Sequence, residues 1–184
     1  MFVRNWMSAP ALVTTSARFA YAAKEFMQKR GVRRLPVVED GSLIGIVTLS
    51  DLASLKKGDA RMVSEMMTAN PLTVDRDDTL ETAAQKMIVD KVSGLPVLDG
   101  GRVVGIITES DLFRALCAML GIGEKGARLI MTVPDDQDLL EAIRAKTGNV
   151  SVRSLVTVHD AKIGQWDVVA RVRGRIGAKA LTAR

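Results

Sequence analysis

Apolar positions along the first two thirds of the chain follow two periods that alternate. A helical period, with apolar side chains three or four positions apart, covers residues 19–27 and again residues 80–88. Each helical stretch is followed by two short apolar runs with a glycine turn between them, over residues 35–47 and residues 95–107. Short β-rich runs joined in this way predict hairpins. The inward face of each expected helix is formed by Phe19, Ala22, Ala23, Phe26 and Met27 in one case and by Leu80, Ala83, Ala84, Met87 and Ile88 in the other.

The two stretches are copies of one another, sixty positions apart. The sequence LPV at residues 35–37 returns at residues 95–97. The longer sequence GIVTLSDL at residues 45–52 returns as GIITESDL at residues 105–112, and the register holds without a gap. A solenoid needs about three stacked units to bury its core, so two copies indicate a small domain used as a pair.

Each copy begins with a short extended piece, at residues 12–14 or 72–74, and we expect Asp51 or Asp111 to open a further helix at its end. The predicted element order of each copy is therefore β-α-β-β-α, and the fold class is α+β. Cys117, the only cysteine, lies on the apolar stripe of the second copy's last helix. It cannot form an intramolecular disulfide, and its position predicts a buried core thiol rather than a nucleophile.

Two hydroxyls and a carboxylate gather where each copy's second strand ends, as Thr48, Ser50 and Asp51 in the first copy. If a helix follows, backbone N–H groups and the positive end of its dipole face outward at this corner. Hydroxyl and N–H groups can hold phosphate oxygens, and a carboxylate can accept both hydroxyl protons of a ribose. Because Ser, Thr and Asp are also the preferred N-cap residues, one such triplet taken alone is better explained as a cap.

The pattern over roughly residues 1–120 resembles the CBS domain, named after cystathionine β-synthase, and in particular the tandem pair called a Bateman module. The resemblance rests on the opening motifs NWMS and EMMT, the two LPV strands and the two endings of the form G-h-h-T-x-S-D-L, where h is aliphatic. We expect one CBS repeat at residues 1–60 and the other at residues 61–121. Together with the duplication, the resemblance favours nucleotide contact in at least one copy.

The resemblance implies a ligand in the cleft between the copies, with an adenine against the strand edges at the LPV motifs. The positions just before those strands commonly reach the phosphates, and here they differ, with Arg33 and Arg34 in one copy and Ser93 and Gly94 in the other. Arginine offers fork-shaped donors for phosphate, so we expect asymmetric sites. The two arginines would also suit a solvated basic helix end. The expected ligand-binding residues are Thr48, Ser50, Asp51, Thr108, Ser110, Asp111, Arg33, Arg34, Leu35, Pro36, Leu95 and Pro96.

The hydrophobic pattern changes after residue 123. Strand-like runs occur at residues 127–133, 150–158 and 166–172, and a helical stripe covers residues 135–146. This predicts the order β-α-β-β. The inward residues of the helix are expected to be Leu139, Leu140 and Ile143.

Behind a CBS pair, this order resembles the start of an ACT domain, which has a ferredoxin-like fold. The chain is therefore similar to the CBS-CBS-ACT proteins of the acetoin-utilisation type, with the ACT-like domain expected at residues 124–184. An ACT domain continues through a second helix and a fourth strand. Here that strand is either absent or cut off, so we expect the domain to be incomplete.

The chain has an ordinary globular composition, with 47% hydrophobic residues. Its longest apolar stretches fall short of the ~20 residues that a membrane span needs, and residues 1–6 do not read as a signal peptide. We therefore expect a cytoplasmic protein with no membrane contact. The net charge of +5 falls mainly after residue 121, so the repeated part is nearly neutral.

A basic run near the C-terminus raises the alternative of nucleic-acid binding. Its members share one sign of charge with no acid among them: Arg171, Arg173, Arg175, Lys179 and Arg184. The first three alternate along an expected strand and so share a face. Aromatic residues make up only 4% of the chain, which leaves few stacking platforms for single strands. An outward basic edge strand that discourages aggregation explains the arginines equally well, and nucleic acid is disfavoured as a partner.

The sequence shows no catalytic constellation. His159 stands beside Asp160 with no nucleophile suggested nearby, and there is no metal-ligand spacing, P-loop or dinucleotide fingerprint. We expect a non-catalytic ligand-sensing protein that needs no cofactor or metal and binds AMP, ADP or ATP, with S-adenosylmethionine ranked below them. The resemblance implies a homodimer, because the family pairs its modules into disc-like dimers. The alternative is a structural or partner-docking module with decayed pockets, which contacts an enzyme or nucleic acid through its basic C-terminal domain.

Overall fold

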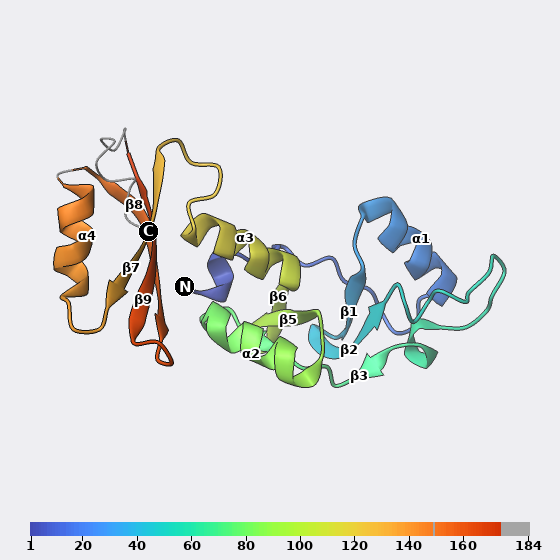
Figure 1. The fold of residues 1–184 in the computed structure, drawn as a ribbon. Helices are drawn as coiled ribbons and strands as arrows, with labels where there is room; N and C mark the ends of the chain where they lie inside the picture. Colours follow the sequence, from blue (N-terminus) through green and yellow to red (C-terminus); the bar gives the residue numbers. More distant parts are fainter. Residues whose placement is uncertain (149, 174–184) are drawn as a thin grey trace. The chain divides into compact units, whose positions relative to one another are not determined.

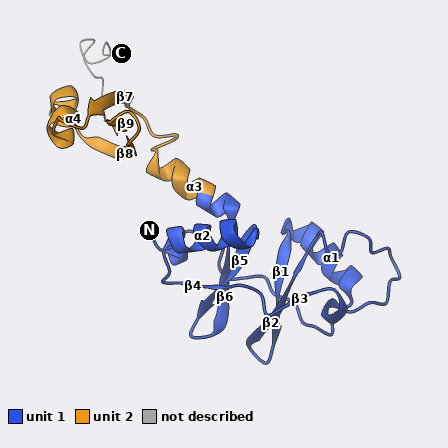
Figure 2. Ribbon diagram, turned by 60° about the horizontal axis from the view of Figure 1, so that its bottom comes forward, with its two compact units in different colours: residues 1–112 blue, residues 113–184 orange. Residues whose placement is uncertain are grey.

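A computed structural model of the chain describes residues 1–148 and 150–173. The chain divides into two compact units, Met1–Leu112 (unit 1) and Phe113–Arg184 (unit 2) (Figure 2). Of the basic residues noted in the sequence, Arg175, Lys179 and Arg184 lie outside the described residues. None of the helices in the described ranges combines the length and the hydropathy that a membrane-spanning helix requires.

Unit 1 contains the duplicated part of the sequence, and each copy has a helix followed by a hairpin. The elements of unit 1 in chain order are η1 (Val3–Asn5), α1 (Ala20–Arg30), β1 (Arg34–Glu39), β2 (Ser42–Thr48), η2 (Val63–Glu65), β3 (Thr68–Ala69), β4 (Val74–Asp75), α2 (Leu80–Asp90), β5 (Gly94–Asp99) and β6 (Arg102–Thr108). The two hairpins lie side by side in the middle of the unit, with α1 and α2 at opposite ends (Figures 1 and 2).

Both predicted hairpins are confirmed, and their registers are equivalent. In β1–β2, Pro36 lies opposite Ile46, and in β5–β6, Pro96 lies opposite Ile106. The turn at Asp40 and Gly41 places both residues at positive φ, 48° and 80°, which is the backbone twist that two-residue hairpin turns favour. A register shift between Val37 and Val38, repeated between Val97 and Leu98, interrupts the period of two in each hairpin.

The opening segments of the two copies are exchanged. The first copy's opening segment (residues 1–8) pairs with the second copy, where Ser8 bridges to Ile106 of β6. The second copy's opening segment (residues 61–69) returns to the first copy, where β3 pairs with β2 and Thr68 lies opposite Ile46. The backbone amide of Val3 donates to the Asp78 carbonyl at 2.9 Å, and residues 63 and 18 repeat this bond at 2.9 Å. Each copy is completed by its twin.

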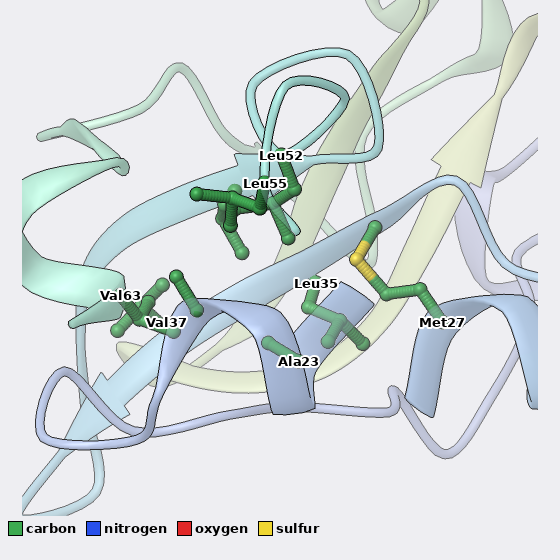
Figure 3. Close-up of a cluster of buried hydrophobic side chains, with 9 residues drawn as sticks. Ala23, Met27, Leu35, Val37, Leu52, Leu55 and Val63 are labelled. Carbon is green, nitrogen blue, oxygen red and sulfur yellow. The ribbon is translucent and has the colours of Figure 1, made fainter. Parts of the chain in front are cut away.

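The core of the first lobe, formed by α1 and the β1–β2 hairpin, shows this exchange (Figure 3). Ala23 and Met27 of α1 are buried against Leu35 and Val37 of β1, as the helical stripe predicted. Val63, from the second copy's opening segment, is also fully buried in this cluster. Apolar burial is the main favourable term in folding, so both copies contribute to the stability of one core.

The expected inward faces hold only in part. In α2, Leu80, Ala83 and Met87 are buried, as predicted. The inward assignment of Ile88 is wrong, because 77% of its surface is exposed. The inward assignment of Phe19 is also wrong, because this residue precedes α1 and is 53% exposed. Spacing fixes which side chains share a face of a helix, but how wide a stripe is covered depends on the facing hairpin.

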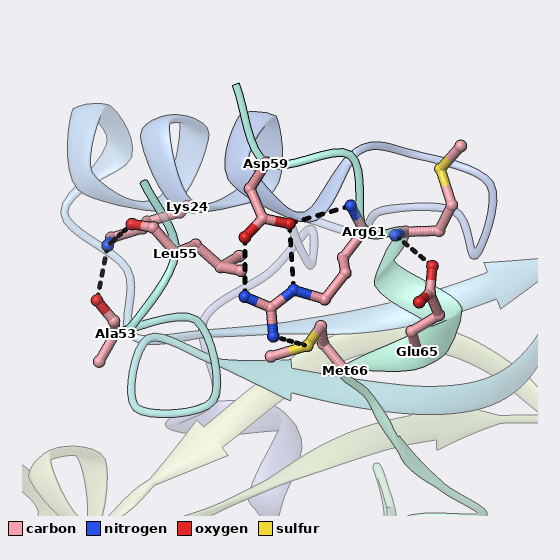
Figure 4. A network of polar contacts seen from close by, with 8 residues as sticks. Lys24, Ala53, Leu55, Asp59, Arg61, Glu65 and Met66 are labelled. Atoms are coloured by element: carbon pink, nitrogen blue, oxygen red, sulfur yellow. Dashed lines mark hydrogen bonds and ion pairs between the residues drawn. The ribbon is translucent and has the colours of Figure 1, made fainter. Parts of the chain in front are cut away.

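The helix expected to open at Asp51 does not form, which corrects the prediction for the first copy. Residues 49–54 form consecutive turns, and Leu52 and Leu55 are buried in the core. The Nζ group of Lys24 donates to the carbonyl oxygens of Ala53 and Leu55, each at 2.8 Å (Figure 4). A side chain thus satisfies carbonyls that amides four residues later would satisfy in a helix.

A second polar contact fixes the return of the chain after these turns. Arg61 contacts Asp59 through its backbone amide and Nε, both at 3.0 Å from Oδ1, and through Nη2 at 2.7 Å from Oδ2 (Figure 4). The carbonyl of Arg61 then accepts from the amide of Ala20 at 2.8 Å. This hydrogen bond joins the start of the second copy's opening segment to the start of α1 in the first lobe.

The second copy does end in a helix, α3 (Glu109–Met119), which begins in unit 1 and ends in unit 2. Asp111 lies in its first turn and is buried, as is Ala115. Cys117 is exposed, so the prediction of a core thiol is wrong. The apolar stripe on which that prediction rested is real, but Leu116 beside it is also exposed, and an apolar spacing does not ensure that the face is covered.

Unit 2 has the predicted order β-α-β-β: β7 (Ala127–Pro134), α4 (Leu139–Thr147), β8 (Val152–Asp160) and β9 (Gln165–Val172). The strands form an antiparallel sheet in the order β7-β9-β8. Ile143 is buried and Leu139 packs on the core, but Leu140 is 61% exposed, which corrects its inward assignment. Asp138 caps α4 by accepting from the amide of Glu141 at 2.7 Å.

The strand that carries Arg171 is the central strand of this sheet, so it cannot be the basic edge strand proposed from the sequence. Arg171 is partly buried, and its Nη1 donates to the carbonyl of Glu124 at 2.9 Å. Arg173, which follows β9, is exposed. Of Arg171 and Arg173, only Arg171 therefore lies in a strand, and that strand is paired on both sides.

Candidate functional site

The triplet at the end of β2 is organised around the Asp51 carboxylate. Oδ2 of Asp51 accepts from the backbone amide of Thr48 at 2.7 Å and from the Thr48 hydroxyl at 2.8 Å. The amide of Asp51 donates in return to Oγ1 of Thr48 at 3.3 Å. Among the described residues, Oδ1 of Asp51 accepts no hydrogen bond. The three-residue spacing thus holds one carboxylate oxygen and leaves the other for a hydroxyl donor.

The second copy repeats the two hydrogen bonds to the carboxylate. Oδ2 of Asp111 accepts from the Thr108 amide at 2.8 Å and from the Thr108 hydroxyl at 2.7 Å. The surroundings differ, because Asp111 is only 3% exposed and lies in the first turn of α3, whereas Asp51 is partly buried and lies in a series of turns. Both triplets therefore act as local caps, and only the second belongs to a helix.

A cavity of about 780 Å³, the first cavity, opens beside Thr48, Ser50 and Asp51. Both copies form its walls. The first copy contributes the end of β2 and the two arginines at the start of β1. The second copy contributes part of its opening segment and the chain around the start of β5. The lining residues are Arg33, Arg34, Ile46, Thr48, Leu49, Ser50, Asp51, Thr68, Asn70, Pro71, Leu72, Lys91, Val92, Ser93, Gly94 and Leu95.

A cavity of about 910 Å³, the second cavity, opens at the equivalent place beside Thr108 and Ser110. Its walls exchange the roles of the copies, since the second copy now supplies the end of its hairpin and the first supplies its opening segment. The lining residues are Met7, Ser8, Ala9, Pro10, Ala11, Leu12, Arg30, Gly31, Val32, Arg33, Arg34, Ser93, Ile106, Thr108, Glu109 and Ser110.

Arg34 lies where the two cavities meet. Its Nη2 donates to the hydroxyl of Ser93, and its guanidinium lies so close to Gly94 that an added Cβ there would be 2.6 Å from Nη1. Burial lowers the pKa of Arg34 below its usual value, while the nearby Glu109 carboxylate opposes this and Arg33 adds to it.

The structure brings most of the expected site residues together. Thr48, Ser50, Asp51 and Leu95 line the first cavity, Thr108 and Ser110 line the second, and Arg33 and Arg34 line both. Asp111 lies behind the second cavity, where it holds Thr108. Leu35 is fully buried in the core, and the side chains of Pro36 and Pro96 line neither cavity. Of the Leu and Pro residues in the two LPV motifs, only Leu95 therefore lies in a cavity wall.

Sequence reasoning did not identify several lining residues. Lys91 lines the first cavity, and Gly31, its equivalent in the first copy, lines the second. Glu109 faces the second cavity where Leu49 faces the first. The sixty-residue register was the signal that could have found them, since equivalent positions in the copies occupy equivalent walls.

The arrangement suits a small polar ligand with an apolar part. Cavities of 300–1,000 Å³ with mostly apolar walls and a few convergent polar groups are typical of ligand sites. Each cavity here combines apolar side chains, hydroxyls held beside a carboxylate, and guanidinium groups that can bind a phosphate. Within the described residues, no group of His, Cys, Asp and Glu side chains is placed to hold a metal ion.

Comparison with known proteins places these features in a wider group. The model of the CBS domain matches residues 3–58 and again residues 63–118. The CBS domain pair of protein MJ0100, in complex with 5′-methylthioadenosine and S-adenosyl-L-methionine, is 32% identical with a TM-score of 0.59, over 63% of this chain and 95% of that one. CBSX2 of Arabidopsis thaliana, in complex with AMP, is 29% identical with a TM-score of 0.57, over 62% and 95%.

Two further matches extend this comparison. A putative acetoin utilization protein (AcuB) from Vibrio cholerae is 25% identical with a TM-score of 0.59, over 69% of this chain and 98% of that one. The L-aspartate semialdehyde sulfurtransferase of Methanocaldococcus jannaschii is 33% identical over 114 residues, which are 61% of this chain and 22% of that protein. The chain thus spans about a fifth of the length of this relative.

Proposed function

The chain belongs to the CBS domain family, with two copies in tandem, and from this premise we propose that it is a non-catalytic regulatory protein that binds an adenosine-containing ligand in the cavities between the copies. The single observation that carries the proposal is the Thr48–Asp51 pair, in which one carboxylate oxygen is held and both residues line a ligand-sized cavity. In the second copy Asp111 holds Thr108 in the same way, and Thr108 lines the cavity.

The ligands of similar proteins support this choice of chemistry. Two of the solved relatives were obtained with such ligands, one with AMP and one with 5′-methylthioadenosine and S-adenosyl-L-methionine, and all of these contain adenosine. In our proposal the carboxylate of Asp51 accepts from the ribose hydroxyls, and Arg33 and Arg34 bind the phosphate. We rank AMP, ADP and ATP first because S-adenosylmethionine is a cation and two arginines would repel it.

The regulatory step follows from the shared walls of the cavities. Each cavity is lined by residues of both copies, so a bound ligand bridges them. A ligand can shift the arrangement of the copies only to the extent that it binds one arrangement more tightly than another. We propose that the exchanged opening segments transmit this shift, because Thr68 of the second copy lines the first cavity and Ser8 of the first copy lines the second.

For unit 2 we propose an ACT-like domain, and for the whole chain a cytoplasmic homodimer of the acetoin-utilisation type. The sheet order β7-β9-β8, with antiparallel neighbours, places one strand between two strands that a helix connects. That split arrangement begins a ferredoxin-like fold. The AcuB match extends over 69% of this chain, so it supports the proposal chiefly through the CBS pair.

Calorimetry on single-cavity variants tests the proposal. Asp51→Asn and Asp111→Asn keep the size of each side chain but remove its charge and leave one acceptor oxygen. We expect Asp51→Asn to lose the AMP site in the first cavity, which Asp51 lines, and to keep the other. We expect Asp111→Asn to lose the site in the second cavity, because it releases the Thr108 hydroxyl that lines that cavity. Ligand at a hundredfold excess over its dissociation constant should stabilise the wild type by about 2.7 kcal/mol.

Two controls make this test decisive. The Asp51 carboxylate is held by two groups of Thr48, the backbone amide and the hydroxyl. Thr48→Ser keeps both groups and should retain binding in the first cavity. Thr48→Val loses the hydroxyl and should weaken binding there. Melting curves without ligand separate a loss of binding from a loss of folding. If millimolar AMP, ADP, ATP and S-adenosylmethionine all leave the wild-type melting curve unchanged, the sensor is ruled out in favour of a docking module with decayed pockets.

A further inference from the structure

Two residues of the first copy, Arg33 and Arg34, line both cavities. The second copy has Ser93 and Gly94 at the equivalent positions, so it offers no matching pair of cations. The duplication has therefore produced two cavities with one pair of arginines between them. Other charged lining residues belong to one cavity each, as Lys91 does to the first and Arg30 to the second.

The position of Arg34 explains why there is a single guanidinium at this place. Residues 34 and 94 are equivalent, and the Arg34 guanidinium lies against Gly94. A Cβ at residue 94 would lie 2.6 Å from Nη1 and 3.0 Å from Cζ of Arg34. Real Cβ atoms do not approach other heavy atoms so closely, so a second large side chain here would displace the first.

Arg34 is held in place lightly. Its one side-chain hydrogen bond within the described residues is from Nη2 to the Ser93 hydroxyl, whereas a guanidinium has five N–H donors. Ser93 lines both cavities as well. The remaining donors are therefore available to an anion on either side, and the planar fork suits two parallel bonds to one phosphate.

We propose that the two cavities compete for the Arg33–Arg34 pair, so that a nucleoside phosphate bound in one cavity weakens the binding of a second nucleoside phosphate in the other. This inference rests on the proposed function and names the regulation of the same site. A guanidinium turned toward one phosphate removes donors and positive charge from the other cavity, and the first phosphate repels the second. Adenosine, which lacks a phosphate, escapes the competition. By linkage, the weakening is equal in both directions.

Titration with AMP and with adenosine tests the competition, using Asp51→Asn and Asp111→Asn as single-cavity proteins. Arg34→Gln should lower AMP affinity about tenfold or more in both single-cavity backgrounds, which is the loss expected for a charge-assisted hydrogen bond. Adenosine affinity should stay within about twofold in both backgrounds. In the wild type the second AMP should bind about tenfold more weakly than AMP binds a single-cavity protein, and Arg34→Gln should abolish this difference.

The outcomes separate the two proposals. If Arg34→Gln lowers AMP affinity in only one background, or if wild type binds two AMP molecules with single-cavity affinities, the competition is overturned and the adenosine site stands. If neither AMP nor adenosine binds the wild type, both proposals are overturned. Arg34→Lys serves as a second variant, since it keeps the charge without the planar fork. In this variant the first AMP should weaken the second by a factor between those of the wild type and Arg34→Gln. Melting curves without ligand confirm that each variant is folded.

Discussion

The side chain of Met67 lies directly over Gly45, so that a Cβ on that glycine would be 2.5 Å from the methionine sulfur. The same relationship joins Met7 to Gly105, where the distance is 2.6 Å. Each methionine belongs to the opening segment of one copy, and each glycine belongs to the hairpin of the other. The glycine of the G-h-h-T motif is therefore a requirement of the exchange, because any larger residue would push the opposite segment away.

The two glycines should respond differently to the same substitution. A Cβ on Gly45 meets the flexible Met67 side chain and lies 3.1 Å from the carbonyl oxygen of Thr68, whereas a Cβ on Gly105 lies 2.9 Å from the carbonyl oxygen of Ser8. Backbone yields less than a methionine, so we expect Gly45→Ala to cost about 1 kcal/mol and Gly105→Ala about 2–3 kcal/mol of unfolding free energy. Urea denaturation measures both, and equal losses would contradict this account.

Lys91 should lower the stability of the protein and strengthen its binding of AMP. It caps α2 with φ 54°, a left-handed conformation that favours glycine, and its equivalent Gly31 caps α1 with φ 66°. Lys91→Gly should raise the unfolding free energy by roughly 0.5–1 kcal/mol and weaken AMP binding in the first cavity, where the lysine adds charge. Gly31→Lys is the matched change and should do the opposite in the second cavity. Thermal denaturation measures the stability of both variants, and calorimetry measures their affinity for AMP. A stability gain in Lys91→Gly without a loss of affinity would show that Lys91 does not contact the phosphate.

The exchanged valines should matter as much as any core residue. Val63 and Val3 are fully buried in lobes formed mainly by the other copy. Val63→Ala and Val3→Ala should each destabilise the protein by about 2 kcal/mol, through lost apolar burial and an unfilled cavity. Val89→Ala is the control, because Val89 is 69% exposed on α2 and should shift the unfolding free energy by no more than about 0.5 kcal/mol. Chemical denaturation would refute the exchange if all three variants behaved alike.

The Asp59 carboxyl should titrate well below its ordinary range. Its hydrogen bonds from the Arg61 side chain, and then from the Arg61 backbone, lower the pKa of Asp59 to about 2. A carboxyl whose pKa falls on folding stabilises the protein above its unfolded pKa of about 3.9 and loses that contribution as pH falls through about 2. In Arg61→Gln the Asp59 pKa should return toward the ordinary value. Carbon-detected NMR titration of the carboxyl measures it, and an unchanged pKa in the variant would exclude Arg61 as the cause.

The hairpins and first helices could be predicted because their signals are local. The two β-rich runs and the turn at Asp40 and Gly41 indicate the hairpin without reference to the rest of the chain. The register shift between Val37 and Val38 was not predicted. The helix expected after Asp51 failed because the competing interactions are distant in sequence, chiefly the contacts of Lys24 with the carbonyls of Ala53 and Leu55. No local pattern in residues 51–58 reveals those contacts.

The local contacts of the candidate site could be predicted from the sequence, but the contacts between the two copies could not. The three-residue spacing of Thr48 and Asp51 predicts their hydrogen bond directly, since it is formed within one turn of the chain. That Arg34 would line both cavities could not be read from the sequence, because it depends on how the two hairpins meet. The exposure of Cys117 was missed for a related reason, as burial is decided by what covers a face.

The exchange of opening segments has a consequence for how this module could have arisen. A single ancestral copy would have had its own hairpin glycine uncovered and its own opening segment without a partner, since each is matched only by a second copy. Such a polypeptide could complete itself only by trading segments with another molecule, in the manner of domain swapping. Gene fusion would then have converted an association that depended on concentration into a permanent one, and freed each half to diverge where the other was not touching it.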